Sequence, residues 1–169
     1  MMGSVSDLLG KRSIFTDLQS RTKQDALEEV AETVCNNIEW LDLARLLEVV
    51  HDRDRVCNTA MGRCIAFPHA RLKEVKEMTV AVGLSAEGIE FDATDGQPVH
   101  CVILLVTPEQ LPSDYLDVLA LFARIGRDEH KMHKLLSVRS PAELIATIKE
   151  FETSEETATS TSPQPGGSS

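Results

Sequence analysis

The chain has 169 residues, of which 42% are hydrophobic and 26% charged, and its formal net charge is −10 at pH 7. This length suffices for one domain with a buried core, and the acidic excess argues against a nucleic-acid partner, because phosphate backbones repel an acidic surface. The same excess permits a basic protein partner, which an acidic surface attracts over distance.

Neither an export signal nor a membrane span is expected from the sequence. Residues 1–20 contain no apolar stretch of the kind found in signal peptides, and charges occur throughout them. The longest apolar run, Cys101–Val106, is far shorter than the ~20 residues that a membrane helix needs. The four cysteines form no CxxC pair. We therefore expect a cytoplasmic protein, not embedded in a membrane, with reduced thiols.

Helices and strands alternate in the first third of the chain. Ser13–Gln19 is short and mixed, which makes it a possible first strand. Thr22 opens a predicted capping box with Asp25, and apolar residues at helical spacing follow it, so a helix is expected here. Leucines and valines over Leu43–Val50 predict a second helix that ends near Arg53–Arg55.

The middle of the chain favours strands. Gly62–Phe67 is predicted to be a strand, followed by a turn at Pro68 and His69. Met78–Ser85 predicts another strand, and an Asp- and Gly-rich turn then leads to a buried strand over Val99–Val106.

The last third of the chain favours helices. Ser113 is expected to cap a helix, and a short helix is expected over Glu129–Leu136. Ser140 as cap, Pro141 at the first position and Glu143 at the third are typical of a helix start. The whole pattern predicts a single α/β or α+β sandwich, with strands in the middle of the chain and helices at both ends.

Both ends of the chain are expected to lie outside the folded domain. The Ser, Thr, Pro and Gly-rich stretch over residues 153–169 buries too little apolar surface to offset its ordering entropy. We therefore predict a flexible N-terminus over residues 1–5, a domain over residues 6–152 and a disordered tail over residues 153–169.

His69 is the leading candidate for chemistry. Pro68 restricts the backbone in front of it, so the imidazole begins near one orientation on a stiff loop. Several upstream side chains suit the oxygens of a phosphoryl group. These are Arg53, Arg55, Asn58, Thr59 and Arg63. The pattern is compatible with a histidine that accepts phosphate through one ring nitrogen.

The residues alone leave other interpretations open. A single histidine after a strand is compatible with a surface or core role, and arginines at a helix end are typical of a solvated face. A metal site using Cys57, Cys64 and His69 matches no zinc spacing. His130 and His133 lie three residues apart on a predicted helix, where an exposed surface is the expectation.

Three motifs resemble a known family. The run "CIAFPHAR" (Cys64–Arg71) resembles the active-site motif of type 2 enzyme IIA proteins, the fructose/mannitol class of the bacterial phosphotransferase system, including its nitrogen-regulatory branch. "IEFDATDGQPVHCVILLVTPEQ" (Ile89–Gln110) and "SPAELIATI" (Ser140–Ile148) are similar to two further family segments. The resemblance covers roughly Ser6–Phe151.

The resemblance implies a fold and a reaction. The fold would be a central mixed sheet flanked by helices. His69 would take a phosphoryl group from the phosphocarrier HPr or a paralogue and pass it on, with no metal or organic cofactor. Arg53 falls on the family's phosphate-stabilising arginine, while Asn58 and Thr59 fall on its Ser-Thr pair. Because the chain contains no transporter domain, the resemblance implies a regulatory protein rather than a sugar-transporting one.

The chain also departs from the family pattern. Cys57, Ala60 and Cys64 replace glycines of the family's loop, where the backbone needs positive φ or close approach. Tyr115 occupies the place of a second histidine, and a phenol offers one hydrogen bond but no cation at neutral pH. Two hypotheses follow. The first is a phosphocarrier that uses His69. The second is a non-catalytic regulatory binding module with the same fold, which would dock on a kinase, transporter or other protein without turnover.

Overall fold

The structure is a computed structural model that describes residues 4–56, 63–93 and 95–160. Four of the residues singled out in the sequence, Cys57, Asn58, Thr59 and Ala60, lie outside the described residues. The elements in chain order are α1 (Val5–Leu8), a 3-10 turn η1 (Lys11–Ser13), β1 (Ile14–Phe15), α2 (Lys23–Asn37), α3 (Leu43–Val56), β2 (Ile65–Ala66), β3 (His69–Arg71), β4 (Thr79–Ile89), β5 (Val99–Thr107), α4 (Ser113–Arg127), α5 (Glu129–Leu136) and α6 (Pro141–Ser160).

A mixed sheet forms the centre of the domain. The long strands β4 and β5 pair antiparallel, with Val82 opposite Ile103. The short strand β1 pairs parallel with β4, while β2 and β3 pair parallel with the other edge of β5. The expected single-domain sandwich with a central mixed sheet is therefore confirmed.

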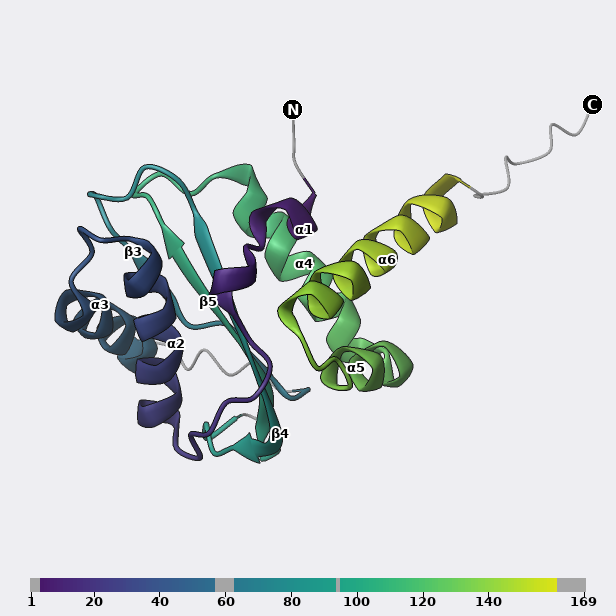
Figure 1. The fold of residues 1–169 in the computed structure, drawn as a ribbon, viewed down its shortest axis with the longest axis horizontal. Coiled ribbons are helices and arrows are strands. Elements are labelled where there is room, and N and C mark those ends of the chain that lie inside the picture. Colours follow the sequence, from purple (N-terminus) through teal and green to yellow (C-terminus); the bar gives the residue numbers. More distant parts are fainter. Residues whose placement is uncertain (1–3, 57–62, 94, 161–169) are drawn as a thin grey trace, which may run out of the picture.

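Helices cover both faces of this sheet (Figure 1). α2 and α3 lie on one face, and α1, α4, α5 and α6 lie on the other. A hydrophobic core lies on each face of the sheet, and alternate residues of β5 pack into one or the other. Val102 and Leu104 face α2 and α3, whereas Ile103 and Leu105 face the other helices. Because this strand is buried on both faces, its sequence is a continuous apolar run rather than an alternating one.

Gly83 allows α2 to pack closely on the sheet. A Cβ atom at this position would lie 2.6 Å from Leu18 Cδ1 and 3.0 Å from Val30 Cγ2. Either distance is shorter than ordinary van der Waals contact. Glycine is therefore required at this point of β4, where Leu18 from the connection before α2 and Val30 from α2 both pack against the strand.

The helix starts follow the capping rules with one exception. Thr22 accepts a hydrogen bond from the Asp25 N–H at the start of α2, and Ser140 accepts one from the Glu143 N–H at the start of α6. The expected Ser113 cap is wrong by one residue. Pro112, with extended backbone, precedes the helix, and Ser113 is already its first residue.

The C-terminal boundary also differs from expectation. α6 does not end before Thr153 but continues to Ser160, and Figure 1 shows its end extending away from the sheet. In this extension the Thr153 hydroxyl donates to the Lys149 carbonyl, at 2.9 Å, and the Ser154 hydroxyl donates to the Phe151 carbonyl. A helix that is already nucleated and packed adds further turns at little cost, which the composition alone did not predict.

The start of the domain is ordered by the same helix. The backbone N–H groups of Val5 and Ser6 both donate to the Glu152 carboxylate, each at 2.9 Å, and Ser4 caps α1. Ser4 and Val5, which the sequence prediction placed in a flexible N-terminus, are therefore part of the fold, because a carboxylate satisfies the free N–H groups of this short helix.

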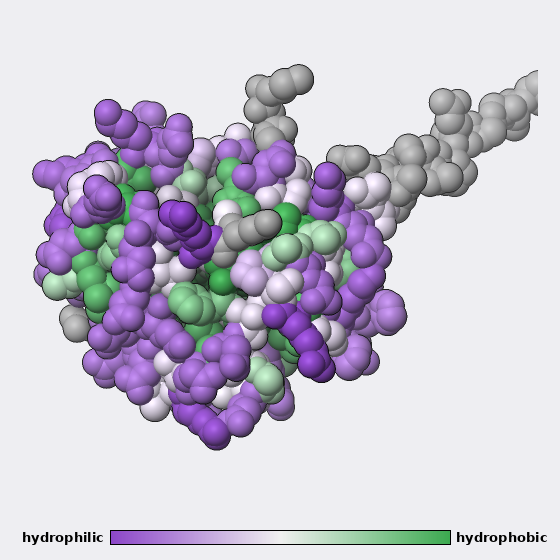
Figure 2. All heavy atoms as spheres, viewed as in Figure 1, coloured by the Kyte–Doolittle hydropathy of each residue, from purple (hydrophilic) through white to green (hydrophobic). Residues whose placement is uncertain are grey.

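Hydrophilic residues cover most of the face shown in Figure 2, with apolar residues visible only in small areas. Among the described residues, we find no helix that is both long enough and apolar enough to cross a membrane.

Candidate functional site

His69 is the first residue of β3, where its side chain is only 7% exposed. The expectation of a loop histidine is therefore wrong. β3 pairs with β5 in a register that aligns His69 with Leu105, and the Pro68 carbonyl accepts the Leu105 N–H at 3.0 Å. Proline cannot donate to a ladder but can accept, so the chain enters the sheet directly at this point. The sheet, rather than a turn, holds the imidazole.

The imidazole lies against the aromatic ring of Tyr115. Ala70, the next residue of β3, packs into the core under α2 and α3, so alternation turns His69 toward the face covered by α4. Tyr115 lies in the first turn of α4, and the two ring centroids are 5.6 Å apart at an interplanar angle of 49°. This separation is typical of a tilted aromatic pair, which restricts the orientation of both rings.

Two arginines place positive charge near His69. Burial lowers the pKa of the imidazole below its ordinary value, and the charges of Arg53 and Arg71 lower this pKa further. Arg53 lies in the last turn of α3, and both arginine side chains are exposed. The neutral imidazole is therefore favoured near neutral pH, which leaves one ring nitrogen with a free lone pair that could act as a nucleophile.

Arg71 is a site residue that the sequence interpretation did not include. It lies two residues after His69 in β3, and side chains two apart in a strand share a face. The sequence "HAR" contains this spacing of His69 and Arg71. It indicates a shared face only if His69 begins a strand, as in the structure, and not if His69 ends a turn.

The backbone before β2 adopts an unusual conformation. Arg63 has φ +55° and Cys64 has φ +68°, in the region that glycine adopts without strain. The Asp95 carboxylate accepts the Arg63 N–H at 2.8 Å, and the Cys64 carbonyl accepts the backbone N–H groups of His100 and Cys101. These bonds hold a backbone conformation that a cysteine disfavours and that glycine adopts without strain.

Metal binding finds no support in the described ranges, 4–56, 63–93 and 95–160. Across them, His, Cys, Asp and Glu side chains form no group of three that could hold a metal ion.

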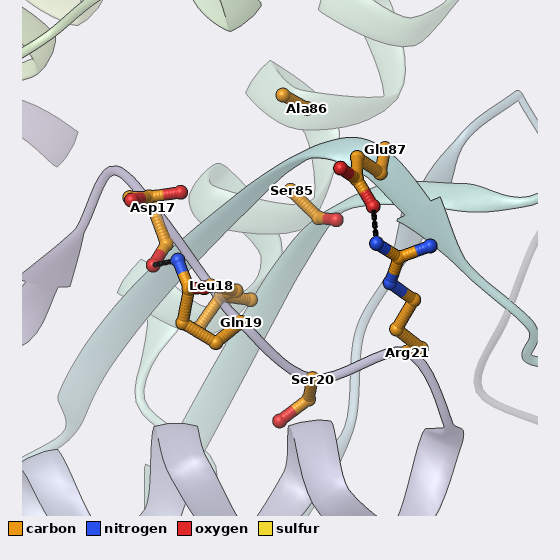
Figure 3. Close-up of a pocket in the computed structure, with 8 residues that line it drawn as sticks. All are labelled: Asp17, Leu18, Gln19, Ser20, Arg21, Ser85, Ala86 and Glu87. Carbon is orange, nitrogen blue, oxygen red and sulfur yellow. Dashed lines mark hydrogen bonds and ion pairs between the residues drawn. The ribbon is translucent and has the colours of Figure 1, made fainter.

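A concave region lies away from His69 on the molecule (Figure 3). It is formed by the connection before α2 and the end of β4, and an ion pair joins Arg21 to Glu87 across it. β4 and β3 lie on opposite edges of β5, so this pocket is separate from His69. Its lining is Asp17, Leu18, Gln19, Ser20, Arg21, Ser85, Ala86 and Glu87. Because this set offers no imidazole or thiol, His69 remains the better candidate.

Comparison with known proteins identifies the domain. Residues 7–151 match the family model described as "Phosphoenolpyruvate-dependent sugar phosphotransferase system, EIIA 2". The chain belongs to this family. The match spans every element from the end of α1 to the buried part of α6, and it includes the pair formed by His69 and Tyr115.

Relatives of this EIIA domain include nitrogen-regulatory proteins. It is 30% identical to the "Nitrogen regulatory protein" of Bradyrhizobium diazoefficiens over 85% of this chain and 94% of that protein. It superposes on the nitrogen regulatory protein IIA-Ntr of Neisseria meningitidis with a TM-score of 0.78 at 28% identity, covering 85% of this chain and 98% of that one.

A more distant neighbour shares the fold. This is the Escherichia coli mannitol-specific enzyme IIA in its complex with phosphorylated enzyme IIB, with a TM-score of 0.69, 20% identity, and coverage of 84% of this chain and 97% of that one. Family and relatives together support a phosphocarrier or regulatory role for this EIIA domain in the phosphotransferase system.

Proposed function

We propose that this EIIA domain accepts a phosphoryl group on His69 from an HPr-like phosphocarrier and serves a regulatory pathway in the cytoplasm. The observation that carries the proposal is the pairing of a buried, oriented imidazole with two nearby guanidinium charges. In the transfer, a ring nitrogen of His69 forms a bond to phosphorus while the bond from phosphorus to the donor's histidine breaks. The donor imidazole leaves with the electron pair of the broken bond.

Charge on the phosphoryl oxygens is the main electrostatic demand of this reaction. Positioning and charge stabilisation account for most catalysis of phosphoryl transfer. Arg53 and Arg71 would supply charge-assisted hydrogen bonds, and the Tyr115 hydroxyl would supply a neutral donor beside the acceptor ring. Asn58 and Thr59, which the resemblance places at the phosphate, remain part of this proposal.

The surface beside Tyr115 supports a protein as the phosphoryl donor. Leu116 is 67% exposed and Leu111 is 40% exposed, so two large apolar side chains reach the surface on either side of Tyr115 in the sequence. Asp114 and Asp117 lie in the same turn of α4. An apolar contact flanked by carboxylates fits a donor that presents apolar and basic residues around its phosphohistidine. The solved complex of a related fold with phosphorylated enzyme IIB also supports a protein partner.

Labelling with purified components tests the proposal. Phosphoenolpyruvate, the general transfer enzyme and HPr should together give an acid-labile phosphoryl mass shift that maps to His69. Because His69 is buried, His69→Gln is a better variant than His69→Ala, since it retains volume and polarity. Loss of labelling in a folded variant is expected. Equal labelling of His69→Gln would assign the role to another histidine.

A binding module without phosphotransfer is the second candidate. The observation that favours it is the positive φ of Cys64, a backbone conformation that costs a cysteine free energy and that glycine adopts without strain. This candidate predicts that the wild-type chain binds an HPr-like protein but never becomes labelled. Labelling of the wild-type chain at His69 excludes it.

A further inference from the structure

Asp54 occupies an unfavourable position in its own helix. It lies in the last turn of α3, directly after Arg53, where the carbonyl ends of the helix dipole disfavour a carboxylate. Lys23 is equally unfavourable at the first position of α2, where the N–H ends disfavour a cation. Neither the Asp54 carboxylate nor the Lys23 ammonium therefore stabilises its own helix through the helix dipole.

The two charges are paired with each other. Lys23 Nζ forms an ion pair with Asp54 Oδ2, and the side chains are only 26% and 13% exposed. Partial burial reduces screening by solvent, so this pair holds its geometry better than an exposed pair does. It joins the start of α2 to the end of α3.

Lys23 is also fixed against the sheet. Its ammonium lies 5.7 Å from the centroid of the Phe91 ring, and Phe91 is fully buried just beyond the end of β4. The Glu90 N–H donates to the Arg21 carbonyl, and Thr22 forms an isolated bridge with Glu90. The position of Lys23 is thus determined by the sheet, and Lys23 transmits that position to the last turn of α3.

We infer that Lys23, acting through Asp54, is a positioning residue that fixes the last turn of α3 and thereby holds Arg53 at the phosphoryl-acceptor site. The inference rests on the proposed function of His69 as acceptor. Asp54 adjoins Arg53 in the chain, so any rotation or fraying of this turn moves the guanidinium away from His69. Lys23 itself needs no contact with the phosphoryl group.

The test is Lys23→Met, which keeps the length and the packing on Phe91 but removes the charge. Phosphotransfer turnover should fall about tenfold with little change in KM for the HPr-like donor, since misplacement of a catalytic group lowers the rate more than binding. The His69 pKa, followed by NMR titration of the unphosphorylated protein, should rise because the Arg53 charge is no longer held nearby.

Three further variants test whether the effect of Lys23→Met comes from loss of the ion pair with Asp54 and acts through Arg53. Lys23→Arg retains the pair and should keep both turnover and the His69 pKa near wild type. Arg45→Met removes the exposed Arg45–Glu74 pair in the first turn of the same helix and should change neither. In an Arg53→Ala background, adding Lys23→Met should produce no further change, because the residue acts through Arg53.

The outcomes separate the inference from the proposed function. An unchanged His69 pKa and turnover in folded Lys23→Met, or a further loss in the Arg53→Ala background, would overturn the positioning role. If Lys23→Met does not fold, a Lys23→Arg variant with impaired turnover despite a native circular dichroism spectrum would overturn it, and one with normal turnover supports it. Failure of the wild-type chain to become labelled would overturn phosphotransfer, whereas the pKa comparison still tests the position of Arg53.

Discussion

The rings of His69 and Tyr115 form a tilted pair between a strand and a helix, with their centroids 5.6 Å apart. β3 supplies the imidazole and the first turn of α4 supplies the phenol, so the pair joins the sheet to the helical layer at the proposed acceptor. A phenol in this place contributes an oriented hydroxyl without adding a positive charge near neutral pH.

Tyr115→Phe removes that hydroxyl and keeps the ring contact. If the hydroxyl donates to a phosphoryl oxygen, the variant loses one hydrogen bond, roughly 0.5–1.5 kcal/mol, and transfer slows by about tenfold or less. Tyr115→His should increase the rate, because its imidazole is partly cationic at neutral pH. Rapid-quench measurement of phosphorylated protein checks both. A Tyr115→Phe rate equal to wild type would remove the hydroxyl from the mechanism.

The arginine charges should be separable by substitution. Arg53→Ala is expected to slow transfer by about one to three orders of magnitude, and Arg53→Lys should restore only part of the loss, since a point charge cannot replace the planar fork. Arg71→Gln should also slow transfer. Both variants should raise the His69 pKa, as read from NMR titration.

Combining Arg53→Ala with Arg71→Gln tests whether burial or arginine charge contributes more to the lowered pKa of His69. Burial is the largest contribution to the shift, so the pKa of His69 should stay below its ordinary value even when Arg53→Ala and Arg71→Gln are combined. An ordinary pKa in the double variant would mean that the two charges, and not the surroundings of the ring, set the protonation of the acceptor.

Stability should depend on pH through His69. Its pKa in the folded state is lowered from the unfolded value of about 6.5, so the unfolded chain binds more protons between these two pKa values. The contribution of neutral His69 is complete above about pH 6.5 and is lost as the pH falls through the folded-state pKa. Urea unfolding across this range should show a decline with acidification that His69→Gln lacks.

Cys64→Gly should stabilise the domain. A non-glycine residue at φ +68° carries a cost on the order of 1 kcal/mol, which glycine relieves. Cys64→Ala is the matched control, because it removes the thiol but retains the Cβ atom. The free energy of unfolding should be higher for the glycine variant than for the alanine variant. The reverse order would show that the backbone at this position is not strained.

Gly83→Ala should have the opposite effect. The added methyl would overlap Leu18 and Val30, and such overpacking typically costs about 1–3 kcal/mol. Gly96→Ala is a useful comparison, since among the described residues, apart from its two chain neighbours, no atom lies within 4 Å of the added Cβ atom. The φ of +71° is the feature there that disfavours alanine. A Gly83→Ala variant with wild-type thermal stability would contradict the close packing of α2 on β4.

Local signals explain why most helices were predicted well. α5 begins and ends where the sequence indicates, because Asp128 caps it and the apolar positions recur at helical spacing. The same is true of the start of α6. Capping and periodicity act over a few residues, so they are visible in one sequence.

The short strands could not be delimited in this way. β2 and β3 contain two and three residues, and each exists because it pairs with β5 more than thirty residues further along the chain. Such pairing is nonlocal and leaves no periodic signal. Because β3 depends on this nonlocal pairing, the sequence did not predict that His69 lies in a strand, that it is buried or that it shares a face with Arg71.

The Glu152 carboxylate that receives the Val5 and Ser6 N–H groups has a consequence for synthesis on the ribosome. The two partners are separated by nearly the whole domain, 147 and 146 residues in sequence. α1 is only four residues long and cannot persist as an isolated helix in water. α1 therefore stays undocked until α6 has left the exit tunnel, so this N-terminal element of the domain is among the last to reach its position.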